Sequence, residues 1–225
     1  MDAKEFFGNW IQVIDTQLLN KALFDLTNEI QRVGESMICP KPELLFEAFS
    51  KCRFDNLKVV VVGQSPYPQE GVATGLAFAN SEYTPKDKWS PSLEVIYKSA
   101  LLQSNDLPFS TFPFIFPELE QLADQGVLLY NAALSCKVGE PESHRLLWRN
   151  FSKKLLNNIA VTKKDVIFAL LGSNAEDVGS EIDTSRKVIC AHPSYYARTN
   201  QPMPDIWTDI NIKLSVRGIE PICWI

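Results

Sequence analysis

A polar turn follows directly on an apolar run in the stretch KVVVVGQSPYP, residues 58–68. Gln64, Ser65 and Tyr67 place an amide, a hydroxyl and an aromatic ring in this turn. The turn lacks the several glycines and the lysine that a phosphate-binding loop uses. Ser65 can therefore be an ordinary turn residue, a reagent, or the replacement of a lost reagent.

Polar residues also end three further apolar runs, at YNAALS, GSN and HPSYYARTN. Asn131 carries an amide with two donors and an acceptor, which is enough to read the edge of a pyrimidine, although an asparagine taken alone in this position is more typical of a strand-end cap. His192 precedes Pro193, and a lone histidine can be a catalyst or a satisfied structural residue. Phe78, in GLAFAN, is on its own typical of a core aromatic.

The elements that must position these residues follow from the apolar pattern. Continuous apolar runs predict buried strands at LKVVVVG, GVLLYNA, DVIFALLGS and RKVICAH. Helix-like segments alternate with them, at residues 91–103, 146–160, 174–181 and 204–216. Strands that alternate with helices predict an α/β fold with a parallel sheet. The ligand crevice of such a sheet lies beyond the carboxyl ends of its strands, so we expect the four polar endings to converge.

We predict a single domain over residues 1–225, because a chain of this length with 45% hydrophobic residues can bury one substantial core. Apolar residues at helical spacing over residues 5–33 predict one long helix or two short ones. The N-terminal helical segment takes up about residues 1–40, and the α/β core takes up about residues 41–225.

The composition limits the class of protein. A formal net charge of −5 argues against a protein that coats nucleic acid non-specifically, because such binding depends on many phosphate contacts. The five cysteines are scattered without a C-x-x-C pair, so neither a disulfide framework nor a zinc site is indicated. The sequence has no signal peptide pattern and no apolar run long enough to span a membrane. We therefore expect an intracellular, cytoplasmic protein without a membrane partner, in which nucleoid or nuclear association stays open.

Taken together, the motifs resemble those of family-1 uracil-DNA glycosylases. The family signature GQDPYH is present as GQSPYP, GLxFS as GLAFA, PPSLxNIYK as SPSLEVIYK, and QGVLLLNAxLTV as QGVLLYNAALSC. SHRLLWRNF is similar to SHxxxGWExF, ALLGSNAEDVGSEID to LWGxxAxxK, and AHPSYYA to AHPSPLS. These matches follow the family's order and extend from about Pro40 to Trp224.

The resemblance implies a four-stranded parallel sheet between helices and an enzyme of base excision repair that flips deoxyuridine out of DNA and hydrolyses its N-glycosidic bond. By position, Phe78 would stack on the uracil ring, Asn131 would read its N3–H and O4, and Tyr67 would exclude the methyl group of thymine. Gln64 would add contacts at the floor of the pocket. His192 would hydrogen-bond the uracil O2 as negative charge develops there.

The partner implied by the resemblance is uracil-containing DNA, single- or double-stranded, and a protein inhibitor or a replication partner is a further possibility. Ser92, Ser173 and Ser194 stand at DNA-binding positions, and Tyr196 takes the place of the family's wedge leucine. Arg198 could supply local positive charge or be a solvated loop residue. No cofactor and no metal are implied, and we expect a monomer.

The main departure from the family is Ser65, which stands where the family has the aspartate that orients and deprotonates the attacking water. Serine is neutral and a poor base, and a general base contributes about 10²- to 10⁴-fold in rate. The sequence therefore predicts a slow glycosylase; the alternative is a weak or inactive module that binds uracil-containing DNA or a partner protein. Glu70 could act as a substitute carboxylate or be a solvated loop charge.

Overall fold

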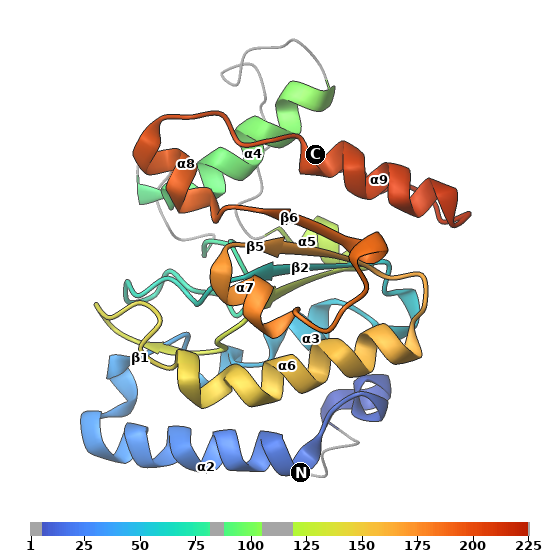
Figure 1. The fold of residues 1–225 in the computed structure, drawn as a ribbon. Helices are drawn as coiled ribbons and strands as arrows, with labels where there is room; N and C mark the ends of the chain where they lie inside the picture. Colours follow the sequence, from blue (N-terminus) through green and yellow to red (C-terminus); the bar gives the residue numbers. More distant parts are fainter. Residues whose placement is uncertain (1–5, 82–87, 105–118, 225) are drawn as a thin grey trace.

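A four-stranded parallel β-sheet forms the centre of the protein in a computed structural model that describes residues 6–81, 88–104 and 119–224 (Figure 1). The strands lie in the order β3-β2-β5-β6, and each neighbouring pair is parallel. Their bounds are Val59–Gly63 for β2, Val127–Asn131 for β3, Ile167–Leu171 for β5 and Lys187–Cys190 for β6. Each strand lies within one of the apolar runs, so the predicted parallel sheet is confirmed.

The strands are apolar along their whole length because both faces of the sheet are covered. Within β2, residues 59–62 are at most 1% exposed. Val60 and Val62 pack into a hydrophobic cluster on one face of the sheet, and Val59 and Val61 pack into a second cluster. The alternation follows from the strand geometry, in which successive side chains point to opposite faces.

Helices lie on both sides of the sheet, with α2 and α6 on one side and α4, α8 and α9 on the other (Figure 1). Their bounds are Thr16–Val33 for α2, Glu47–Lys51 for α3, Pro91–Ser104 for α4, Glu120–Asp124 for α5, Arg145–Thr162 for α6, Ser173–Val178 for α7, Pro193–Thr199 for α8 and Ile206–Val216 for α9. The helices predicted over 91–103, 146–160 and 204–216 correspond to α4, α6 and α9, and the one predicted over 174–181 is the shorter α7.

The N-terminal segment forms a short 3-10 helix, Gly8–Gln12, followed by the long helix α2. Asp15 begins α2, because its carboxylate accepts hydrogen bonds from the backbone N–H groups of Gln17 and Leu18. Gly34, with φ 92°, follows the last helical residue. The segment is therefore helical as predicted, and α2 packs on α6.

A small antiparallel pair, β1 (Ile38–Cys39) with β4 (Cys136–Lys137), was not predicted. Two-residue strands carry no measurable periodicity, so the sequence gives no signal for them. The backbone N–H of Gly139 also donates to the carbonyl of Pro68 at 2.9 Å. This last bond ties the loop after β4 to the turn after β2. Across the described residues, no helix is both long and apolar enough to cross a membrane.

Candidate active site

A cavity of about 430 Å³ lies where the carboxyl ends of the strands meet. Gln64, Ser65 and Tyr67 line it from the turn after β2, Asn131 lines it from the end of β3, and His192 lines it from the end of β6. Its described lining also includes Phe78, Ser92, Glu142, Ser194 and Arg198. The cavity therefore brings together three of the four polar strand endings, whereas no residue of GSN is in its described lining.

Gly63, the last residue of β2, allows two of these side chains to approach the backbone closely. A Cβ atom at position 63 would lie 2.9 Å from Oδ1 of Asn131 and 3.0 Å from Cζ of Phe78. Asn131 is paired with Gly63 in the sheet and is 5% exposed. Within the described part of the chain, no hydrogen bond engages the Asn131 amide, so it does not cap a strand and is available to a ligand.

Phe78 reaches the cavity through a strained backbone. Its φ of 68° lies in the left-handed region, which costs a residue with a bulky side chain on the order of 1 to 3 kcal/mol. The Tyr67 hydroxyl donates to the carbonyl of Phe78 at 2.9 Å and fixes both residues. The Phe78 ring lies 5.6 Å from the His192 ring, at an interplanar angle of 38°. Strain of this kind is typical of functional sites, and it presents an aromatic face beside a histidine.

His192 is held as a neutral ring with a defined tautomer. Its Nδ1 accepts the backbone N–H of Ser194 at 3.2 Å, and the Ser194 hydroxyl lies 2.9 Å from the same atom. Because a backbone N–H can only donate, Nδ1 is unprotonated and Nε2 carries the proton. Burial, assisted by the nearby Arg198 charge, lowers the pKa of His192 to about 4. His192 also caps α8, so its structural role coexists with an Nε2–H donor for a ligand.

Gly172, at the end of β5, makes room for this histidine. A Cβ atom at position 172 would lie 2.9 Å from Cβ of His192, and the φ of 96° is one that only glycine adopts readily. The glycine of the motif GSN thus supports the site, whereas Ser173 beside it is exposed at the start of α7 and does not line the cavity.

Glu142 is a cavity residue that the sequence analysis did not find. Its backbone has φ 63°, and its N–H donates to the Ser65 hydroxyl oxygen at 3.3 Å. Its carboxylate accepts hydrogen bonds from Nε2 of Gln64 and, at 2.6 Å, from Nδ2 of Asn174. Glu142 lies in the polar turn EPES, 77 residues after Ser65, so neither composition nor spacing gives a signal for it.

The other predicted DNA-binding residues differ in their surroundings. Ser92 lines the cavity and is 4% exposed, and Ser194 lines it while bonded to His192. Tyr196, the expected wedge residue, is 8% exposed and packs in the cluster beneath α8. Its neighbour Tyr195 is 41% exposed. The sequence analysis did not predict a helix over residues 193–199, and the helical turn there directs Tyr196 inward and Tyr195 outward.

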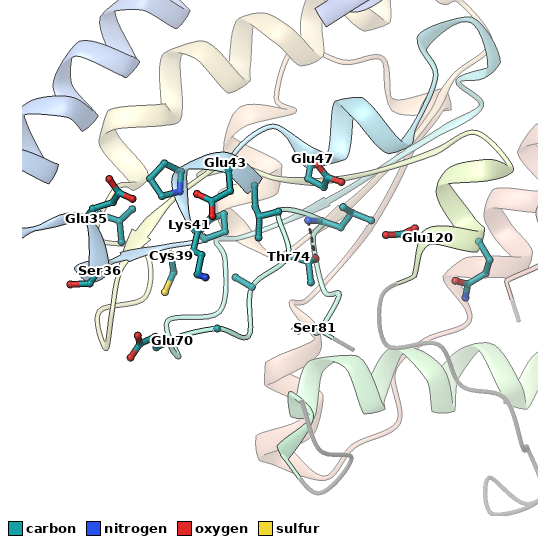
Figure 2. A pocket seen from close by; sticks show the side chains of 18 of the residues that line it. Glu35, Ser36, Cys39, Lys41, Glu43, Glu47, Glu70, Thr74, Ser81 and Glu120 are labelled. Atoms are coloured by element: carbon teal, nitrogen blue, oxygen red, sulfur yellow. Dashed lines mark hydrogen bonds between the residues drawn. The ribbon is translucent and has the colours of Figure 1, made fainter. Parts of the chain in front are cut away.

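Glu70 lies at a second and larger cavity, of about 1070 Å³. Figure 2 shows its side chain among those of Cys39, Lys41 and Glu43. Glu70 does not line the cavity that contains Ser65. The structure therefore gives no support to Glu70 as a substitute carboxylate for the missing aspartate.

Comparisons with known proteins agree with this geometry. The family model described as "Uracil DNA glycosylase superfamily" matches residues 49–214. The chain belongs to this family. Among curated uracil-DNA glycosylases, that of Helicobacter hepaticus is 33% identical over 239 residues, covering 100% of this chain and 97% of the relative. That of Borrelia duttonii is 32% identical over 199 residues, which is 85% of each chain.

Solved structures support the fold. The mimivirus UNG variant Y322L in complex with UGI has a TM-score of 0.79 at 23% sequence identity, and the match covers 100% of this chain and 88% of that one. The wild-type UNG of Nitratifractor salsuginis has a TM-score of 0.58 at 20% identity, covering 90% of this chain and 99% of that one. The predicted uracil-DNA glycosylase fold is therefore confirmed.

Proposed function

We propose that this member of the uracil-DNA glycosylase family hydrolyses the N-glycosidic bond of deoxyuridine in DNA, as the first step of base excision repair. The observation that supports this most directly is the cavity itself. It combines the unengaged amide of Asn131, the aromatic ring of Phe78 and a neutral His192 whose tautomer is fixed. These groups supply recognition, stacking and a donor for the leaving group.

In the proposed reaction, the flipped base stacks on Phe78 and pairs with the Asn131 amide. The amide oxygen accepts the uracil N3–H, and the amide nitrogen donates to O4. Cytosine presents an acceptor at N3 and a donor at position 4, so it mismatches both groups. As the bond between N1 and C1′ breaks, its electron pair moves onto the uracil, and Nε2–H of His192 donates to O2. Such a placed donor is worth about 10²- to 10³-fold in rate.

Tyr67 accounts for discrimination against thymine in this proposal. Its hydroxyl is fixed on the carbonyl of Phe78, so its ring cannot turn away from the cavity. Thymine would require room for a methyl group beside this ring. Gln64 contributes less directly, because its side-chain amide donates to Glu142.

Contacts with DNA in this proposal come from the lining of the cavity and from Ser173 at the start of α7. Ser92, Ser173, Ser194 and Arg198 supply hydroxyl groups and one cation for phosphates, which position the strand without reading its sequence. A wedge role for Tyr196 requires its ring to leave the packed site in which it lies. The mimivirus complex with UGI supports the further expectation that a protein inhibitor is a partner.

Ser65 favours a rate below that of relatives with an aspartate at this position. A neutral hydroxyl can hold a water molecule but cannot take its proton near neutral pH. The same observation supports a second candidate function, a catalytically inactive module that binds uracil-containing DNA. The two functions share the base pocket and differ only in turnover.

A single-turnover assay separates them, with protein in excess over a labelled single-stranded oligonucleotide that holds one uracil. Thymine and cytosine strands serve as controls, and alkali reveals abasic sites. Cleavage at uracil that falls at least about 100-fold in His192→Ala supports the glycosylase. Selective binding of the uracil strand without cleavage over hours supports the binding module.

A further inference from the structure

Glu142 carries the one carboxylate among the described residues that line the cavity. Hydrolysis of an N-glycosidic bond requires a water molecule to lose a proton as it attacks, and a carboxylate within hydrogen-bond reach can accept that proton. Ser65 cannot fill this role, and Glu70 lies at the other cavity. The described part of the chain thus offers Glu142 as the carboxylate in the right place.

The loop holds Glu142 in a defined position. Its backbone is in the left-handed region, and such a conformation persists only where the surroundings enforce it. The enforcing contacts come from two separate segments, the turn after β2 and helix α7. Gln64 after β2 and Asn174 in α7 each donate to the carboxylate, and Ser65 accepts the Glu142 backbone N–H. Asn174 is itself 4% exposed, so it is a fixed donor rather than a surface contact.

The contact between Glu142 and Ser65 also orients the serine. The Ser65 oxygen accepts the backbone N–H of Glu142 at 3.3 Å, which leaves its O–H free to donate. A water molecule beside both residues can therefore accept a hydrogen bond from Ser65 and donate one to the carboxylate of Glu142. Serine then orients the water and glutamate accepts its proton, which are the two roles that the resemblance assigns to a single aspartate at position 65.

We propose that Glu142 is the general base of the reaction, with Ser65 as the residue that positions the water. This inference rests on the proposed glycosylase activity. The water oxygen forms a bond to C1′ and gives a proton to the Glu142 carboxylate. The bond between C1′ and N1 breaks, and its electron pair leaves with the uracil, which His192 stabilises. The alternative is that Glu142 only holds its own loop against the turn after β2 and helix α7.

The experiment compares single-turnover rates and uracil-strand affinities of four variants with those of the wild-type chain. Glu142→Gln keeps the shape of the side chain and removes the base, so we expect the rate to fall about 10²- to 10⁴-fold while the Kd for the uracil strand changes by less than about threefold. Glu140→Gln is the matched control, because Glu140 lies two residues away, is exposed and pairs with Lys137 at 2.6 Å. Its rate should equal that of the wild-type chain.

The third and fourth variants place a carboxylate at position 65. Ser65→Asp combined with Glu142→Gln should raise the rate at least about 10-fold above that of Glu142→Gln alone, because the new carboxylate can take up the proton. Ser65→Asp in the otherwise unchanged chain should gain less than this, because a base is already present. If Glu142 only held its loop in place, the double variant would not recover its rate, since an aspartate at position 65 cannot replace the contact to Asn174.

Each outcome decides the matter. Loss of rate with retained affinity, followed by recovery in the double variant, establishes the base. Equal rates for Glu142→Gln and the wild-type chain overturn the base and leave the glycosylase in place. A parallel loss of rate and affinity without recovery shows that Glu142 only holds its loop in place. A wild-type chain that binds the uracil strand but never cleaves it overturns the proposed function, and the base with it.

Discussion

At the scale of single residues, Asn131 is the group that decides which base is bound. Asn131 is 5% exposed, and its amide engages no described residue, so it can bind a ligand. We expect Asn131→Ala to weaken binding of a uracil-containing strand about 10- to 100-fold, since two hydrogen bonds to a buried base are lost. Affinity for a matched thymine strand should change little. Fluorescence anisotropy with both strands measures this, and Asn150→Ala, an exposed asparagine on α6, is the control. Equal weakening for both strands would refute the role.

The burial of His192 predicts how the free energy of unfolding depends on pH. An unfolded histidine has a pKa near 6.5, whereas burial and Arg198 lower the pKa of His192 to about 4 in the folded chain. Between these values the unfolded chain binds more protons, so the free energy of unfolding decreases as the pH falls from about 6.5 toward 4. The contribution of this one group is at most roughly 3 kcal/mol. His192→Gln should remove it.

Urea unfolding of the wild-type chain and of His192→Gln at pH 7 and pH 4 measures the difference. His144, whose pKa burial also lowers, contributes to both proteins and therefore cancels in the comparison. Identical acid sensitivity of the two proteins would show that His192 is protonated at little cost in the folded state.

At the scale of elements, two neighbouring residues at the end of β2 affect different properties: Gly63 affects the affinity for the uracil strand, and Val62 affects the free energy of unfolding. Gly63→Ala would bring a methyl group to 2.9 Å from Asn131 and 3.0 Å from Phe78, so both base-binding groups must shift. We expect at least about a 10-fold loss of uracil-strand affinity, equivalent to about 1.4 kcal/mol. Val62→Ala, one residue earlier on the same strand, should lower the free energy of unfolding by about 1 to 3 kcal/mol and leave affinity unchanged, because Val62 faces the core. Normal affinity in Gly63→Ala would show that the approach is not needed.

Helix α8 makes a second prediction at this scale. Tyr196 packs in the core beneath the helix, so Tyr196→Ala should lower the free energy of unfolding by about 2 to 4 kcal/mol. Tyr195→Ala, at an exposed position, should lower it by less than about 0.5 kcal/mol. Thermal unfolding of the two variants tests this. If Tyr196→Ala leaves the free energy of unfolding unchanged but weakens the binding of DNA, Tyr196 acts as the wedge residue instead.

The elements also show what the sequence could predict. The four strands were predicted because continuous apolar runs, such as the four valines at residues 59–62, are typical of strands that are buried on both faces. Their polar endings located the site, because parallel strands present their carboxyl ends at one edge of the sheet. The short pair β1–β4 and the helix α8 were missed, because two to seven residues carry too little periodicity. The orientation of Tyr195 and Tyr196 depends on α8 and was missed with it.

Glu142 was missed for a different reason. Its place in the cavity depends on a left-handed backbone and on contacts with Ser65 and Asn174, which lie 77 and 32 residues away in the sequence. No local pattern encodes such contacts, because they exist only after the loop after β4 is tied to the turn after β2. Residues that substitute for a lost group are therefore found from the fold rather than from the motif.

At the scale of the whole molecule, the net charge of −5 sets how DNA is held. Few phosphates can be neutralised, because the described lining of the cavity has two basic residues, Lys88 and Arg198, while His192 is neutral near pH 7. For single-stranded DNA, each neutralised phosphate contributes about −0.7 to the slope of log K against log salt. We therefore expect a slope of about −1 to −3 between 50 and 200 mM salt.

Arg198→Gln should reduce the steepness of that slope by about 0.7, because one phosphate contact is lost. Lys21→Gln is the matched control, since Lys21 is exposed on α2, on the other side of the sheet, and pairs with Asp25. Titration of a uracil strand at several salt concentrations gives the slopes. A wild-type slope steeper than about −5 would mean that the DNA path extends over many more cations than the rim of the cavity provides, and affinity would then depend mainly on the phosphate backbone. A shallow slope means that affinity depends on the base in its pocket, so the protein selects uracil by binding the flipped nucleotide rather than by retaining the strand.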